Sequence, residues 1–109
     1  MTNKLHITPG DILREEFLEP LAITPYRVSK DTGISATALG EIIAGKRSVT
    51  SETGLILDKY FRMSEGFWSR IQNNYDLFEA RKKMKKRLAA LKPLKMVHLE
   101  AYANLHHPV

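Results

Sequence analysis

The chain has 109 residues, of which 43% are hydrophobic and 27% are charged, a composition typical of a folded globular domain. It contains no cysteine, which excludes disulfide scaffolds, thiolate nucleophiles and thiolate metal sites. Its net charge of +5 is uneven, because residues 1–80 carry 9 basic and 11 acidic side chains, whereas residues 81–109 carry 8 basic side chains and one acidic one. No membrane-length apolar run and no secretory signal are visible, so we expect a cytoplasmic protein without a membrane partner.

Start and stop signals predict the first two helices. Two Thr-Pro pairs, beginning at positions 8 and 24, each place a capping hydroxyl before a proline suited to the first helical turn. Pro20 is expected to end the first helix, which gives a helix over about 9–19. Gly33 favours the left-handed conformation that ends a helix, so the second helix is predicted over 25–32.

A third helix is predicted directly after this glycine turn. Ser35 is a preferred cap residue and Gly45 offers the next stop, which gives a helix over about 36–44. Its apolar residues stand at i, i+3 and i+4 and form one buried face: Leu39, Ile42 and Ile43. Its other face carries small or polar residues: Ala36, Thr37, Gly40, Glu41 and Ala44. Two short helices with this arrangement are typical of the helix-turn-helix motif, whose second helix lies in the DNA major groove.

Two further helices complete an all-α prediction. Thr50 caps a fourth helix over about 51–61, and Ser64 with Glu65 begins a fifth that extends from residue 65 onward. Neither glycine nor proline interrupts the fifth helix before Pro93, which is expected to break it. Alternating patterns of strand length are missing, so no sheet is expected. Apolar residues follow the fifth helix at helical spacing: Phe67, Trp68, Ile71, Tyr75 and Phe78.

Six of the seven residues in the run 81–87 are cationic. Two interpretations remain open: a solvated helix end, or a docking surface for an anionic partner such as DNA phosphate. Apolar residues follow the run, which predicts that part of the tail packs: Leu88, Leu91, Leu94, Met96 and Leu99. Residues 94–105 are predicted to form a short helix that returns onto a dimer.

Several motifs carry a family resemblance over about residues 8–80. The stretch from Pro9 to Leu21 resembles the opening of HigA-type antitoxins, the VapI-like branch of the phage-repressor-like (XRE) helix-turn-helix family. The likeness continues in order along the chain through Gly33-Ile34-Ser35, Glu41-Ile42-Ile43, Gly45-Lys46-Arg47, Phe67-Trp68, Gln72-Asn73 and Asn74-Tyr75-Asp76-Leu77.

This resemblance implies a fold, two macromolecular partners and a dimer. The fold is a five-helix phage-repressor-like DNA-binding bundle over residues 1–80, here with a long fifth helix and a basic C-terminal extension over 81–109. The function is that of a homodimeric antitoxin, which binds double-stranded operator DNA of its own operon and neutralises a small basic RelE-like mRNA-cleaving toxin. A stand-alone helix-turn-helix regulator without a cognate toxin is the alternative. A neighbouring reading frame for a RelE-like protein distinguishes the two.

Carried onto this sequence, the resemblance places the DNA contacts on the third helix and the following loop: Ser35, Ala36, Thr37, Gly40, Glu41, Lys46, Arg47 and Ser48. The Thr37 methyl group would contact thymine and Glu41 would accept from cytosine, while the loop would contact phosphates. The alternative is that Glu41 is merely solvated and that Lys46 and Arg47 merely complement the negative end of the third helix.

Departures from the family pattern weaken the expected contacts. Pro25 stands where these repressors often have a phosphate-binding glutamine, and it has neither a side-chain amide nor a backbone donor. The small residues Ala36 and Gly40 make direct base readout thin, so a modest, shape-based or degenerate DNA-binding surface is a further possibility. Arg62 replaces the glycine that usually follows the fourth helix, so we expect this helix to end differently or to continue.

The apolar stripe of the fifth helix is longer than one face of a small bundle needs. It predicts a dimer interface formed by four residues: Trp68, Ile71, Tyr75 and Phe78. Ile56 and Tyr60 form an apolar pair on the fourth helix that belongs either to an interface or to an enlarged core. The four histidines, His6, His98, His106 and His107, lie in the presumed termini, and no nucleophile–base pair or phosphate-binding loop occurs. Catalysis, a cofactor and a metal site are therefore not expected.

Overall fold

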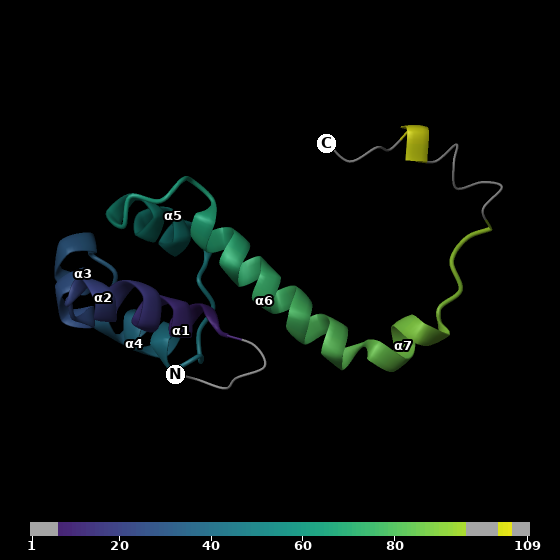
Figure 1. Ribbon diagram of the computed structural model, residues 1–109, viewed down its shortest axis with the longest axis horizontal. Coiled ribbons are helices and arrows are strands. Elements are labelled where there is room, and N and C mark those ends of the chain that lie inside the picture. The colour runs from purple at the N-terminus through teal and green to yellow at the C-terminus, as the bar shows by residue number, and fades with distance from the viewer. Residues whose placement is uncertain (1–6, 96–102, 106–109) are drawn as a thin grey trace. The chain divides into compact units, whose positions relative to one another are not determined.

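The computed structural model describes residues 7–95 and 103–105 (Figure 1). All regular secondary structure within these ranges is helical, which confirms the all-α prediction. The described residues divide into two units with the boundary after residue 79: residues 7–79, and residues 80–95 with 103–105. Over the described ranges, no helix has the length and apolar character that a membrane span requires.

The first helical segment is longer and less regular than predicted. It consists of α1 (Pro9–Ile12), a π-helical stretch (Leu13–Leu18) and α2 (Glu19–Leu21). The segment continues past its expected end because Pro20 lies in the first turn of α2, where a residue without an N–H is tolerated. The predicted end at residue 19 is therefore wrong by two residues.

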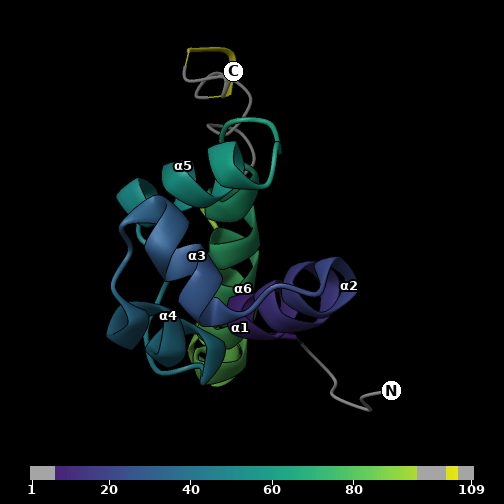
Figure 2. The same ribbon diagram turned by 90° about the vertical axis from the view of Figure 1, so that its left-hand side faces the viewer.

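The helix-turn-helix pair follows (Figure 2). It comprises α3 (Pro25–Thr32) and α4 (Ala36–Ile43), separated by a turn of three residues. Gly33 takes a φ of 83°, the left-handed conformation that glycine adopts most readily. The Ser35 Oγ then accepts a hydrogen bond from the Ala38 N–H at 3.0 Å and caps α4.

The next helix, α5 (Ser51–Tyr60), ends in a left-handed turn although no glycine is present. Arg62 itself takes a φ of 58°, and the following Met63 N–H bonds to the Asp58 carbonyl oxygen at 2.7 Å. This is the pattern of a glycine-terminated helix. The expectation that α5 ends differently without the glycine is therefore wrong, and the left-handed arginine costs about 1 kcal/mol.

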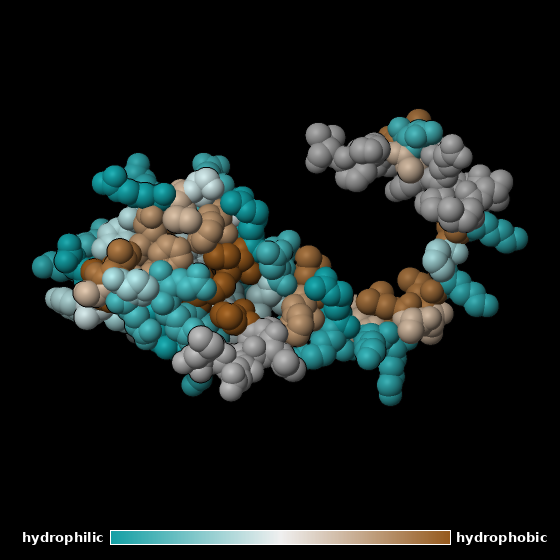
Figure 3. All heavy atoms as spheres, viewed as in Figure 1, coloured by the Kyte–Doolittle hydropathy of each residue, from teal (hydrophilic) through white to brown (hydrophobic). Residues whose placement is uncertain are grey.

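The fifth predicted helix is divided in the structure. It begins two residues later than predicted, as α6 (Phe67–Lys83), and a break at Met84 separates it from α7 (Lys85–Ala90). Described residues 80–95 are all exposed. On α7, hydrophobic side chains gather along one side and hydrophilic ones along the other (Figure 3). Packing of the tail onto a dimer stays a prediction; Met96 and Leu99 lie outside the described residues.

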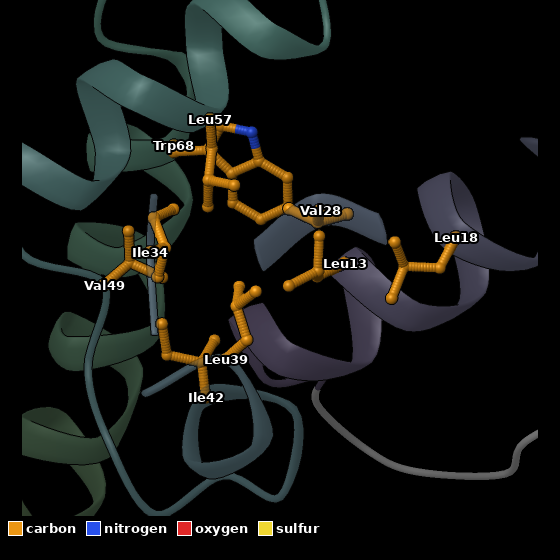
Figure 4. Packing of buried hydrophobic residues seen from close by; sticks show 9 residues of the cluster. All are labelled: Leu13, Leu18, Val28, Ile34, Leu39, Ile42, Val49, Leu57 and Trp68. Carbon is orange, nitrogen blue, oxygen red and sulfur yellow. The ribbon is translucent and has the colours of Figure 1, made fainter. Parts of the chain in front are cut away.

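The core lies among the helices of the first unit (Figure 4). Its members come from the first helical segment, the helix-turn-helix pair, the loop after it, and the two helices that follow: Leu13, Leu18, Val28, Ile34, Leu39, Ile42, Val49, Leu57 and Trp68. The Trp68 side chain is completely buried, and its ring centroid lies 5.2 Å from that of Phe17. This core fixes α4 against the rest of the unit by its apolar face.

Candidate nucleic-acid interface

The residues predicted to contact DNA lie at the surface, on α4 and the loop after it. Glu41 is partly buried. The other seven are exposed: Ser35, Ala36, Thr37, Gly40, Lys46, Arg47 and Ser48. The opposite side of α4 is buried through Leu39 and Ile42. The helix therefore presents a face of small residues outward, with a basic loop at its C-terminal end.

The loop after α4 is held at both ends. At its start, the N–H groups of Gly45 and Lys46 bond to the carbonyl oxygens of Ile42 (3.0 Å) and Glu41 (2.8 Å), which is a Schellman motif. At its far end, the Val49 N–H donates to the Oε1 of buried Gln72 at 2.7 Å. Backbone bonds to α4 at one end and the bond to Gln72 of α6 at the other therefore hold the backbone of the loop that carries Lys46 and Arg47.

Gln72 was visible in the sequence only as part of a family motif, without a role. Its Nε2 donates to the Asp76 Oδ1 at 2.9 Å, so both the oxygen and the nitrogen of the side-chain amide are hydrogen-bonded. A glutamine inside an otherwise apolar helical stripe is the signal that a buried polar contact exists. Its partner, a loop amide 23 residues earlier, leaves no such signal.

A close backbone contact joins α1 to α4. A Cβ placed on Gly10 would lie 1.9 Å from the carbonyl oxygen of Ile42, well inside any permitted contact. Gly10 therefore allows α1 to approach the last turn of α4 directly. The position of the candidate recognition surface depends on this glycine, although Gly10 itself is buried.

Two of the predicted DNA contacts bind each other. The Nε and Nη2 of Arg47 lie 2.7 and 2.6 Å from the Oε1 of Glu41. Both side chains are only about half buried, with exposed fractions of 50% for Arg47 and 42% for Glu41. In the structure Glu41 is therefore not merely solvated, and the positive charge of the loop is partly neutralised.

A polar cluster connects α3 to α5 beside the helix-turn-helix pair. The Tyr60 hydroxyl and the Arg27 Nε both donate to the Oδ2 of Asp31 at 2.7 Å. These two bonds lower the pKa of the Asp31 carboxyl, and the bond to Asp31 raises the pKa of the Tyr60 hydroxyl. Tyr60 also packs against the core, and together with the exposed Ile56 it lines an adjoining groove. The predicted apolar pair therefore stays together at the surface, with Tyr60 also in contact with the core.

The four residues predicted at a dimer interface do not share one environment. Trp68 belongs to the core and has no exposed surface, so its assignment to the interface is wrong. Helical spacing alone could not separate the inward from the outward part of the stripe. Ile71, Tyr75 and Phe78 are partly exposed and line a shallow apolar hollow with Ile7 and Ile12. Hydrophobic surface is visible between α1 and α6 (Figure 3). Burial raises the pKa of the Tyr75 hydroxyl.

Acidic and histidine side chains would be the ligands of a metal ion in the part of the chain that the structure describes. Within residues 7–95 and 103–105, no group of three or more His, Asp or Glu side chains is placed to hold a metal ion. All four histidines lie outside these ranges. What the surface offers is a small-residue helix face, two cations and several hydroxyl groups, which suit a nucleic-acid backbone and groove.

Comparison with known proteins gives a consistent set of relatives, although no model of a protein family matches the sequence. The chain is 37% identical over 71 residues to virulence-associated protein I of Dichelobacter nodosus, covering 65% of this chain and 66% of that protein. It is 28% identical over 103 residues to antitoxin HigA-1 of Vibrio cholerae, covering 94% and 96%. Its fold is similar to the solved structure of Pseudomonas aeruginosa antitoxin HigA with the higBA promoter. The TM-score is 0.77 at 31% identity, with 82% of this chain and 98% of that one covered.

Proposed function

We propose that this chain, which belongs to the HigA-type family of helix-turn-helix antitoxins, binds operator DNA of its own operon and neutralises a small RelE-like toxin. One observation carries the DNA-binding part. The fold that presents the exposed face of α4 and the loop after it is similar to the fold of a protein whose solved structure includes promoter DNA. We expect the chain to act as a homodimer in the cytoplasm, where operator DNA is found.

The chemistry of the surface supports a division of labour. Thr37 and Glu41 lie on α4 and would face base edges in the major groove, whereas Lys46, Arg47 and Ser48 would contact phosphates. Ser35 uses its oxygen as an acceptor for the cap of α4, which leaves its hydroxyl hydrogen for a phosphate. With so few base-reading side chains, phosphate contacts supply most of the affinity.

Replacing both Lys46 and Arg47 by alanine is expected to weaken binding by a similar factor to the promoter of the operon and to those sequence variants of it that leave the base pair facing Glu41 unchanged. Each phosphate contact contributes about one unit to the slope of log K against log salt, so the slope should fall by about two. Fluorescence anisotropy over a salt series measures this. Alanines at the exposed Lys59 and Arg70, on α5 and α6, remove the same charge elsewhere and should change the slope much less. An unchanged slope in the loop variant would exclude these residues from the interface.

The toxin-binding part is tested separately from DNA. Co-expression with the neighbouring reading frame, followed by purification through a tag on this chain alone, should recover a small basic protein in a fixed ratio. Growth arrest caused by that protein should be relieved by this chain. Recovery of this chain alone, with promoter binding intact, would favour the stand-alone regulator.

Dimerisation is proposed through the hollow lined by Ile71, Tyr75 and Phe78. Placing a lysine at position 78 would bury a charge in a dimer interface, so Phe78→Lys should give a monomer at micromolar concentration. Leu77→Lys is the matched control, because Leu77 is on the same helix, 47% exposed and not among the residues lining the hollow. Light scattering measures the oligomeric state of both variants. A Phe78→Lys protein that remains dimeric would show that the dimer interface lies elsewhere.

We assign no catalytic role to the chain. The relatives described above are antitoxins and a virulence-associated protein, and the proposed functions require only binding. DNA and toxin binding need complementary surfaces, not proton transfer or a nucleophile.

A further inference from the structure

We propose that Glu41 is a specificity-determining residue that withholds Arg47 from DNA until a base supplies a hydrogen-bond donor to its carboxylate. The inference deepens the proposed DNA-binding function and rests on it. Its starting point is the ion pair between the two side chains, with the Arg47 Nε and Nη2 at 2.7 and 2.6 Å from the Glu41 Oε1.

The location of this pair sets the Glu41 contact of Arg47 against a phosphate contact through the same edge of the guanidinium. Glu41 is on the recognition helix and Arg47 is in the loop proposed to contact phosphates. The two nitrogens that Arg47 gives to Glu41 form one of the two edges with which a guanidinium binds a phosphate through two parallel hydrogen bonds. A phosphate contact through that edge therefore requires the ion pair to open. The carboxylate also repels an approaching phosphate while it stays close to the loop.

Opening the pair leaves Glu41 in need of a donor. In the major groove, the amino group of cytosine is a base donor that a carboxylate accepts from. Where the operator places a cytosine opposite Glu41, the carboxylate exchanges one partner for another and Arg47 is released to the phosphate. Opposite guanine or thymine the carboxylate meets acceptors, so the ion pair persists and one phosphate contact is lost, whereas the N6 amino group of adenine is a donor like that of cytosine. Specificity then arises mainly by rejecting wrong DNA.

Both partners are half exposed, so the pair is weak enough to exchange. Exposed ion pairs contribute at most about a fivefold factor to an equilibrium. This sets the scale of the effect, since Glu41→Gln removes the charge but keeps the shape and an amide oxygen. We expect Glu41→Gln to bind a scrambled duplex about fivefold more tightly than the unmodified protein does. Binding to the promoter duplex should change by less than twofold, so the specificity ratio should fall about fivefold.

The test is a double-mutant cycle with four proteins: unmodified, Glu41→Gln, Arg47→Ala and the double variant. Each is titrated onto a promoter duplex and a scrambled duplex of equal length and composition at one salt concentration. The gain caused by Glu41→Gln on scrambled DNA should disappear in the Arg47→Ala background, because no arginine remains to be released. Glu16→Gln, an exposed acid on the first helical segment, controls for the change in net charge.

The possible results separate the inference from the proposed function. If Glu41→Gln tightens binding to both duplexes equally, or acts equally with and without Arg47, the inference is overturned while DNA binding stands. If Arg47→Ala changes neither affinity, Arg47 does not contact phosphates, and both the inference and the proposed role of Arg47 in DNA binding fail. Circular dichroism of each variant shows whether the fold is retained.

Discussion

Replacing Gly10 by alanine is expected to lower the free energy of unfolding by about 3 kcal/mol, which corresponds to a fall in Tm of about 15 °C for a unit of this size. The new Cβ would lie 1.9 Å from the Ile42 carbonyl oxygen, 2.8 Å from the Ile42 carbonyl carbon and 2.8 Å from the Ile43 Cα. All three neighbours are backbone atoms, so no side chain can rotate away. Either α1 or the last turn of α4 must move, and the substitution should weaken DNA binding as well.

Gly40→Ala is the matched control for this prediction. Gly40 also lies within a helix, but a Cβ at this position meets nothing within 4 Å. Alanine should therefore raise the free energy of unfolding by about 0.5–1 kcal/mol through its better helix propensity. Urea unfolding followed by circular dichroism measures both variants. Equal effects of the two substitutions would contradict the close contact between α1 and α4.

Gly40→Ala also reports on the DNA surface. Gly40 is exposed on the face of α4 that would enter the major groove. If its lack of a side chain permits close approach to DNA, the variant should bind promoter DNA less tightly although it is more stable. A variant that is more stable and binds equally well would show that Gly40 makes no close contact.

Local signals explain why most helix starts could be predicted from the sequence. The Thr-Pro pairs and Ser35 act through hydrogen bonds that span only three residues, for example from the Asp11 N–H to the Thr8 Oγ1 at 3.0 Å. The turn at Gly33 likewise depends on the conformational freedom of one residue. Interactions of this range are encoded in adjacent residues, so a sequence pattern is enough to reveal them.

Contacts between distant residues account for what the sequence did not predict. The stripe of α6 follows helical spacing throughout, but only the packing of Trp68 against Phe17 and the rest of the core shows which part is buried. The ion pair of Glu41 and Arg47 joins residues whose separate roles the family pattern indicates, while their mutual contact depends on how the loop folds back. The sequence therefore indicates which residues form the candidate surface, but it does not reveal the contacts that these residues make with one another.

Asp58 is the clearest case of a residue that the sequence did not single out, and replacing it by alanine should lower the free energy of unfolding by about 3 kcal/mol. Its Oδ2 accepts from the Gly66 N–H at 2.8 Å and its Oδ1 from the Trp68 N–H at 2.9 Å. The side chain is almost fully buried and connects the end of α5 to the start of α6. Alanine would leave two N–H groups at a helix N-terminus without their charged acceptor, in a place that water reaches poorly.

Two further variants make the Asp58 prediction specific. Asp58→Asn keeps one oxygen acceptor, so it should lose about half as much stability as alanine does. Asp31→Ala is the exposed counterpart, because Asp31 also accepts two hydrogen bonds, from Arg27 and Tyr60, but lies at the surface. It should be far less destabilising, since water replaces the lost bonds. Urea unfolding of the three variants gives the order, and an Asp58→Ala protein as stable as Asp31→Ala would show that the Asp58 carboxylate does not hold α6 in place.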